Sequence, residues 1–205
     1  MIYLSNGKET LNYYKQNAKQ YCRITQSLDF SSVQMRFLSY LNPSAHILDF
    51  GCGSGRDTKY FLAHGYHTDA IDGSEELCRI ASEYTGVHVK QMLFQELNAA
   101  EEYDGIWACS SILHSTYYEL KDILKELAHA LKKEGILYAS FKYGDFEGMR
   151  NGRYFIDLTE GKLQKILQET NVFELKEKWI STDIRPGRDE EKWMNIILIK
   201  KNCIY

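Results

Sequence analysis

The chain has 205 residues, a net charge of −3 at pH 7 and an ordinary composition, with 44% hydrophobic and 26% charged residues. These values predict one soluble globular domain and give no basic face of the kind that nucleic-acid binding usually needs. No apolar run is long enough for a membrane span or a secretion signal, so we expect a cytoplasmic protein. Five scattered cysteines without a C-x-x-C pair predict free thiols: Cys22, Cys52, Cys78, Cys109 and Cys203.

Apolar side chains at helical spacing predict two helices in the first forty residues, the second of them ended by Pro43. From residue 46 onward, short apolar segments alternate with amphipathic ones. Strands are predicted at 46–50, 67–71, 87–93, 104–109, 135–142, 172–181 and 192–200. Helices are predicted at 56–64, 74–85, 118–133 and 159–169.

This alternation predicts an α/β fold, with a Rossmann-like, seven-stranded, mostly parallel sheet and helices on both faces. No helix fits between the last two strands, so a hairpin joins them and the last strand is antiparallel. We expect a single domain in which residues 1–42 form an N-terminal helical cap, or lid, and residues 43–205 form the core.

A glycine-rich loop follows the first predicted strand. Its glycines stand at alternate positions: Gly51, Gly53 and Gly55. The dinucleotide fingerprint has a different spacing, and Arg56 occupies the place of its third glycine. Asp49, just upstream, disfavours a pyrophosphate and favours a cationic, amino-bearing ligand. Asp72, about twenty residues further on, stands where an acid can bind both hydroxyls of a ribose. With both acids in place, an ordinary tight turn is the weaker reading of the loop.

Four segments, at 49–55, 65–74, 103–114 and 132–139, resemble the ordered motifs of class I S-adenosylmethionine (SAM) dependent methyltransferases. One departure is Glu134, where the family often has proline or another small residue. The resemblance implies SAM as cofactor, S-adenosylhomocysteine (SAH) as product, and the seven-stranded sheet described above. Segment 65–72 is also similar to the small tellurite-resistance methyltransferases of this family.

The resemblance further implies a set of cofactor-binding residues. The glycine loop would hold the methionine part of SAM, with Asp49 near its amine, Asp72 on the ribose and residues 95–97 beside the adenine. The aromatic Tyr14 and Tyr21 would come from the lid. The full set is Tyr14, Tyr21, Asp49, Gly51, Cys52, Gly53, Gly55, Asp72, Gly73, Ser74, Gln95, Glu96, Leu97 and Cys109.

Ligands of open parallel sheets sit outside the carboxyl ends of the strands, and several charged residues are predicted to reach that rim. His114 follows the fourth strand and is the candidate catalytic residue; it can take a proton or orient the acceptor, or line the loop passively. The substrate candidates lie in loops 142–153 and 182–190. They are Lys142, Arg150, Arg153, Arg185 and Arg188. Arginine forks suit anionic groups, although each residue alone can be solvated surface charge.

The leading hypothesis is in-line methyl transfer from SAM to a small anionic molecule, with no metal and with no nucleic-acid or membrane partner. A tellurite- or selenite-type oxyanion is one acceptor that the arginines would suit. A SAM-binding sensor or partner subunit without catalysis, and a dehydrogenase, are the alternatives. The sequence is compatible with a monomer or a homodimer.

Overall fold

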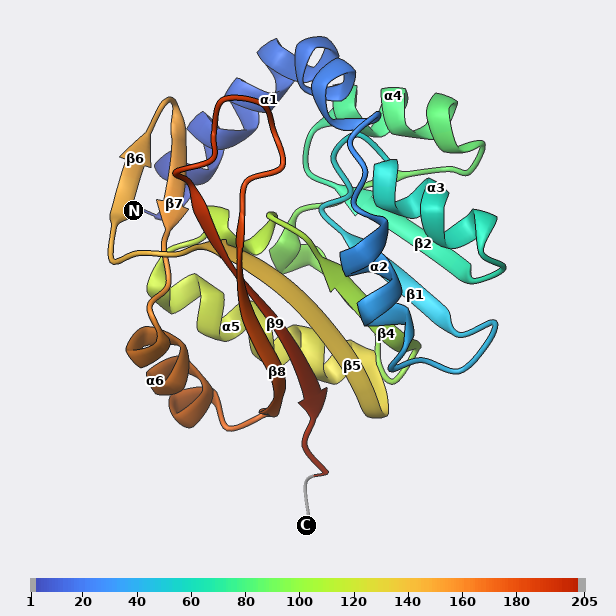
Figure 1. The fold of residues 1–205 in the computed structure, drawn as a ribbon, viewed down its shortest axis with the longest axis vertical. Helices are drawn as coiled ribbons and strands as arrows, with labels where there is room; N and C mark the ends of the chain where they lie inside the picture. The colour runs from blue at the N-terminus through green and yellow to red at the C-terminus, as the bar shows by residue number, and fades with distance from the viewer. Residues whose placement is uncertain (1–2, 203–205) are drawn as a thin grey trace.

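A seven-stranded sheet forms the centre of the computed structural model, which describes residues 3–202 (Figure 1). Cys203 therefore lies outside the described residues. The strand order is β3-β2-β1-β4-β5-β9-β8, and β9 runs antiparallel to both of its neighbours. The strands are β1 (His46–Phe50), β2 (His67–Asp72), β3 (Lys90–Gln91), β4 (Tyr103–Ala108), β5 (Leu131–Lys142), β8 (Phe173–Thr182) and β9 (Lys192–Lys200). The predicted sheet, with its antiparallel last strand, is confirmed.

Helices cover both faces of the sheet because the strands are apolar on both sides. One layer holds α2 (Ser31–Leu38), α3 (Arg56–Ala63) and α4 (Glu75–Thr85), and the other holds α5 (Tyr117–Ala130) and α6 (Glu160–Thr170). The first layer packs on a buried aromatic cluster, in which the rings of Trp107 and Tyr138 stack 4.0 Å apart. The buried apolar side chains of α5 pack in the other half of the core; they include Leu120, Ile123, Leu124 and Leu127.

The helix α1 (Tyr3–Thr25) and a small hairpin, β6 (Glu147–Arg150) and β7 (Arg153–Ile156), lie beside each other at one end of the sheet (Figure 1). The amide of Tyr154 donates to Thr10 Oγ1 over 3.0 Å, which joins hairpin and helix. The two strands pair only with each other in their sheet. Helix α1 lies over the carboxyl ends of the central strands, beside the loop that follows β1 (Figure 1).

The hairpin corrects the prediction of a plain loop at 142–153. Its turn residues Asn151 and Gly152 both have positive φ, of 52° and 74°. An Asn-Gly pair with this backbone is the strongest short-range hairpin signal, because its twist matches that of the flanking strands. Arg150 and Arg153 therefore face each other across a paired ladder.

Several predicted boundaries differ from the structure, and three of the differences have a clear local description. The second helix ends at Leu38, well before Pro43, where the Ser39 hydroxyl donates to the carbonyl of Arg36. The strand predicted at 87–93 shrinks to Lys90–Gln91, because side chains of α4 bond its first amides, as Ser82 Oγ does with Val89. The strand predicted at 135–142 instead begins at residue 131, directly after α5.

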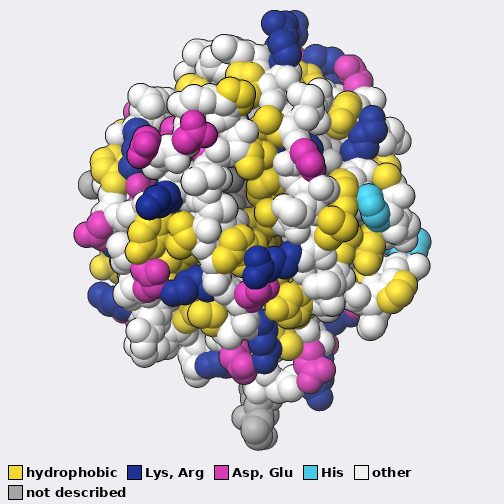
Figure 2. All heavy atoms as spheres, viewed as in Figure 1, with side chains coloured by type: hydrophobic (Ala, Val, Ile, Leu, Met, Phe, Trp, Pro, Cys, Tyr) yellow, Lys and Arg dark blue, Asp and Glu magenta, His cyan; other side chains and the backbone are white. Residues whose placement is uncertain are grey.

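Charges of both signs are interspersed over the face shown in Figure 2, without a continuous band of either. Among residues 3–202, no helix has the length and apolar character needed to cross a membrane. The four cysteines within this range are free thiols.

Candidate functional site

The glycine loop between β1 and α3 is held in a backbone that side chains rarely adopt. Gly51 and Gly53 have φ of 84° and 57°. A Cβ on Gly51 would lie 2.5 Å from the Cβ of Ser111, and one on Gly53 would lie 3.0 Å from the hydroxyl of Tyr21. Glycine is therefore required here by both conformation and space, and the loop backbone stays open to a ligand.

A cavity of about 430 Å³ lies against this loop. Asp72, at the end of β2, lines it, and the backbone holds its carboxylate in place. One oxygen accepts from the amide of Gly53 and the other from the amide of Ser74, both over 2.9 Å. Burial raises the pKa of Asp72, while these amide donors act in the opposite direction. Each oxygen keeps a lone pair for a further donor such as a hydroxyl.

The remainder of this cavity is largely apolar. Met92, Leu93 and Phe94 form one wall, and Phe94 stacks on the buried Phe50 with ring centroids 4.6 Å apart. The helix α1 adds Leu11 to this lining. A flat hydrophobic slot next to a fixed carboxylate suits a nucleoside, whose base is apolar on its faces and whose ribose donates hydrogen bonds.

Eight of the predicted cofactor residues line this cavity: Tyr14, Tyr21, Gly51, Gly53, Asp72, Gly73, Gln95 and Cys109. Asp49 does not. It is buried beneath the loop and accepts a hydrogen bond of 2.6 Å from the Thr58 hydroxyl. Burial, and then the nearby charge of Asp57, raise the pKa of Asp49 well above its usual range. Its contact with a ligand amine stays a prediction.

The other predicted cofactor residues also lie outside the larger cavity. Glu96 accepts a bond from the amide of Leu93 and so caps a short 3-10 turn, whereas the side chain of Leu97 belongs to the core. Gly55 packs against α4, and Ser74 contributes its amide to Asp72 but not its hydroxyl. These residues support the wall of the larger cavity but do not line it.

A second cavity of about 120 Å³ adjoins the first. It includes Cys52 and opens toward β5, β9 and the segment between β8 and β9. Six residues line both cavities, and we call them the shared wall: Tyr14, Tyr21, Gly51, Cys109, Ser110 and His114. A group bound in one cavity can therefore meet a group bound in the other only at this wall.

The shared wall contains an ordered pair, Tyr14 and His114. Nδ1 of His114 donates to the carbonyl of Tyr154 over 2.7 Å, so Nε2 of the neutral ring accepts from the Tyr14 hydroxyl over 2.9 Å. Burial lowers the pKa of His114 to about 4, and the positive charge of Arg153 acts in the same direction. The imidazole is therefore neutral at pH 7, with its lone pair already directed at Tyr14.

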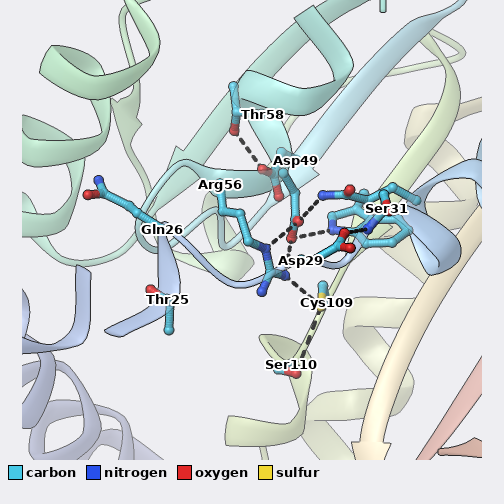
Figure 3. A network of polar contacts seen from close by, with 12 residues as sticks. Thr25, Gln26, Asp29, Ser31, Asp49, Arg56, Thr58, Cys109 and Ser110 are labelled. Carbon is cyan, nitrogen blue, oxygen red and sulfur yellow. Dashed lines mark hydrogen bonds and ion pairs between the residues drawn. The ribbon is translucent and has the colours of Figure 1, made fainter. Parts of the chain in front are cut away.

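Arg56 and Asp57, the first residues of α3, add a polar network that the sequence analysis did not single out (Figure 3). The Arg56 guanidinium binds both oxygens of Asp57 at 2.8 and 2.9 Å and lies toward Cys109. Gln34 and the Trp107 indole also donate to Asp57, over 2.6 and 2.9 Å. In the sequence, this network is indicated only by two adjacent residues of opposite charge at the start of a helix, directly after Gly55.

Most of the predicted substrate cations line the smaller cavity, and their partners differ. Lys142 and Arg188 share the carboxylate of Glu191. Arg185 forms a fork with Asp183. Arg153, at the start of β7, lines the cavity without an ion pair among the described residues.

Arg150 is the exception, because it lies outside both cavities. Its guanidinium is paired with Asp157 at 2.7 Å and lies over the ring of Phe146. Arg150 and Arg153 are paired across the hairpin, but Arg150 has Asp157 as its partner, whereas Arg153 lies over the ring of Tyr13.

A cluster of His46, Asp69 and Glu102 lies away from these cavities, where β1 begins. Their ligand atoms lie within 4.8 Å of one another, and His46 Nε2 is 2.9 Å from an oxygen of Asp69. Their separation along the chain hides this group from a search for metal-ligand spacing.

Comparisons with known proteins agree with this geometry. Residues 47–135 match the family described as Methyltransferase domain. An uncharacterized methyltransferase of Staphylococcus carnosus (strain TM300) is 25% identical over 166 residues, which cover 74% of this chain and 80% of that relative.

Solved structures show the same fold. The 1,6-didemethyltoxoflavin-N1-methyltransferase of Burkholderia thailandensis, with 1,6-didemethyltoxoflavin and SAH bound, aligns with a TM-score of 0.74 and 20% identity, over 93% of this chain and 85% of that one. The magnesium protoporphyrin IX methyltransferase of Synechocystis PCC 6803, with SAH bound, aligns with a TM-score of 0.72 and 15% identity, over 93% and 97%. At these identities the likeness establishes the fold.

The predicted fold and enzyme class are thus confirmed, and the predicted cofactor agrees with the SAH bound in both neighbours. Residues 47–135 match the methyltransferase-domain family, and the chain as a whole has the class I fold of SAM-dependent methyltransferases.

Proposed function

We propose that this protein transfers a methyl group from SAM, bound in the larger cavity, to a small anionic acceptor in the smaller one. The observation that carries the proposal is the shared wall, which joins a nucleoside-sized cavity of about 430 Å³ to a charged cavity of about 120 Å³. Two adjoining sites let two reactants be held in line while water is excluded.

The residues of the larger cavity fit SAM. Gly51 and Gly53 leave their backbone uncovered at places where a Cβ would collide with Ser111 or Tyr21. Asp72 would bind the ribose hydroxyls, and Phe94 with Leu93 would flank the adenine. When bound there, SAM supplies a methyl group that its sulfonium makes electrophilic.

The acceptor would be anionic because cations exceed anions around the smaller cavity. Five cations line it, and three carboxylates accompany them, with Glu191 shared between two. The cavity's small volume favours a small molecule over an RNA or protein target. A tellurite- or selenite-type oxyanion remains one acceptor of this class.

Tyr14 and His114 would orient the acceptor. The lone pair of His114 is already engaged by the Tyr14 hydroxyl, so any proton from the acceptor would pass to Tyr14 Oη as the Tyr14 proton passes to His114 Nε2. With a pKa of about 4, His114 is a weak base. This arrangement favours acceptors that need little deprotonation, such as amines, thiolates or ionised oxygens.

Isothermal titration with SAM and SAH tests the cofactor, and release of SAH on a panel of small carboxylates, amines, thiols, tellurite and selenite tests the reaction. We expect micromolar binding of SAH and turnover on an anionic member of the panel. Binding of SAH without turnover on any member would favour the sensor alternative. Binding of NADH without binding of SAM would refute the proposal.

A further inference from the structure

Arg153 differs from every other cation of the smaller cavity in what surrounds its guanidinium. Arg56, Lys142, Arg185 and Arg188 each lie within 4.0 Å of a carboxylate. Within residues 3–202, Arg153 has no carboxylate at that distance. Among the cations that line this cavity, Arg153 is thus the one for which the described residues provide no counter-ion.

The Nε–H of Arg153 is also unsatisfied, since this atom is buried and has no hydrogen-bond partner. Leaving a buried donor unpaired is unfavourable, and more so for a charged group. Among the described residues, the guanidinium has one hydrogen bond, a long one of 3.5 Å from Nη1 to the Tyr14 hydroxyl. A protein rarely keeps such a donor unless something else completes it.

Aromatic rings hold this guanidinium in position. It lies over the ring of Tyr13 at 4.3 Å and close to the rings of Phe155 at 5.1 Å and Tyr14 at 5.8 Å. Stacking of this kind fixes the plane of the fork without using its N–H donors. Because Arg153 lines the smaller cavity, a ligand bound there lies next to this fork.

We infer that Arg153 binds a carboxylate group of the methyl acceptor, as the anchor that holds the acceptor beside the shared wall. A planar carboxylate can take two parallel N–H bonds from a guanidinium, including the one from Nε. One uncompensated positive charge matches one negative charge, which favours a monoanion over phosphate. This inference rests on the proposed function and adds the acceptor's chemical class.

The position of Arg153 connects the anchor to the reaction. Its Nη1 contacts the Tyr14 hydroxyl, which in turn binds His114 Nε2. A carboxylate on Arg153 would also offset the positive charge that helps to keep His114 neutral. Acceptor binding and the protonation of His114 are therefore coupled, and the coupling gives a second readout.

The test is a titration of sodium acetate and sodium benzoate into the SAH-saturated protein, followed by NMR of the arginine Nε–H groups. We expect a saturable shift of the Arg153 signal, which is assigned by its absence in Arg153→Gln. Sodium chloride at equal ionic strength should give no saturable shift. The imidazole signal of His114 should move in the same titration.

The matched control is Arg150→Gln, in the same hairpin but outside the cavity and paired with Asp157. We expect at least a tenfold loss of benzoate affinity in Arg153→Gln and less than a twofold change in Arg150→Gln, with thermal unfolding of each variant showing that it is folded at the titration temperature. Equal benzoate affinity in both variants would overturn the inference. Saturation of Arg153 by sodium phosphate but not by either carboxylate would overturn the carboxylate assignment.

Titration of SAH into the same three proteins separates this inference from the proposed function. If SAH binds all three and the carboxylates bind none, the anchor alone is refuted. If SAH does not bind the unmodified protein, the proposed function itself fails.

Discussion

The two cavities are built in different ways, although they share a wall. The larger one is shaped by backbone: a glycine loop, two amides that hold Asp72, and a short apolar segment after β3. The smaller one is shaped by side chains that converge from α1, α3, β5, β7 and the segment after β8. The first kind of site recognises a constant ligand, whereas the second can be changed one residue at a time.

The largest effect should come from Asp72→Ala, which removes the carboxylate that faces the larger cavity. Loss of charge-assisted hydrogen bonds to a ribose should weaken SAH binding by about 100-fold. Isothermal titration measures the change, and Asp69→Ala, exposed on the same strand, is the control. Unchanged SAH affinity in Asp72→Ala would contradict the assignment of the cofactor to this cavity.

A second effect concerns acid stability, through His114 on the shared wall. The pKa of His114 is lowered from an ordinary 6.5 to about 4, so between these values the unfolded chain binds a proton that the folded protein does not. The stability that the neutral imidazole contributes above pH 6.5 is therefore lost as the pH falls toward 4, by about 2–3 kcal/mol.

Urea unfolding at pH 7.5 and pH 4.5 measures this loss. We expect His114→Gln to lose about 2 kcal/mol less between the two pH values than the unmodified protein does. His88→Gln, at an exposed position, should behave like the unmodified protein. Identical pH dependence in all three proteins would mean that His114 titrates as an exposed histidine.

The smallest effect should come from Arg188→Gln, at the rim of the smaller cavity. The Arg188 side chain is 42% exposed and shares Glu191 with Lys142, so solvent screens its charge. We expect less than a threefold change in the KM for the acceptor and no change in SAH affinity. A tenfold rise in KM would show that the rim, rather than the hairpin, selects the acceptor.

Much of the fold could be predicted from the sequence because the spacing of apolar residues within a short segment distinguishes a strand from a helix. The strands at 46–50 and 192–200 have the predicted bounds, and the glycine loop identified the larger cavity. The Asn151-Gly152 pair also indicates a hairpin turn. The sequence analysis instead treated residues 142–153 as a loop that carries positive charges.

The smaller cavity was less predictable because it depends on which partner each charge finds. Arg150 and Arg153 look alike in the sequence, yet Asp157 pairs with one and not with the other. Arg56 is adjacent to the glycine loop, and its role depends on Asp57, Gln34 and Trp107 meeting across three elements. Contacts between residues that are distant in the sequence are set by tertiary packing, which no local sequence pattern shows.

The hairpin β6–β7 has a consequence for how this molecule can diversify. Its strands pair only with each other, and it joins the rest of the chain between β5 and α6. The register of the seven-stranded sheet does not depend on it, yet it carries Arg153 and the carbonyl that orients His114. Under the proposed function, exchanging this hairpin for another of equal length would change which acceptor is bound while leaving the seven-stranded sheet unaltered.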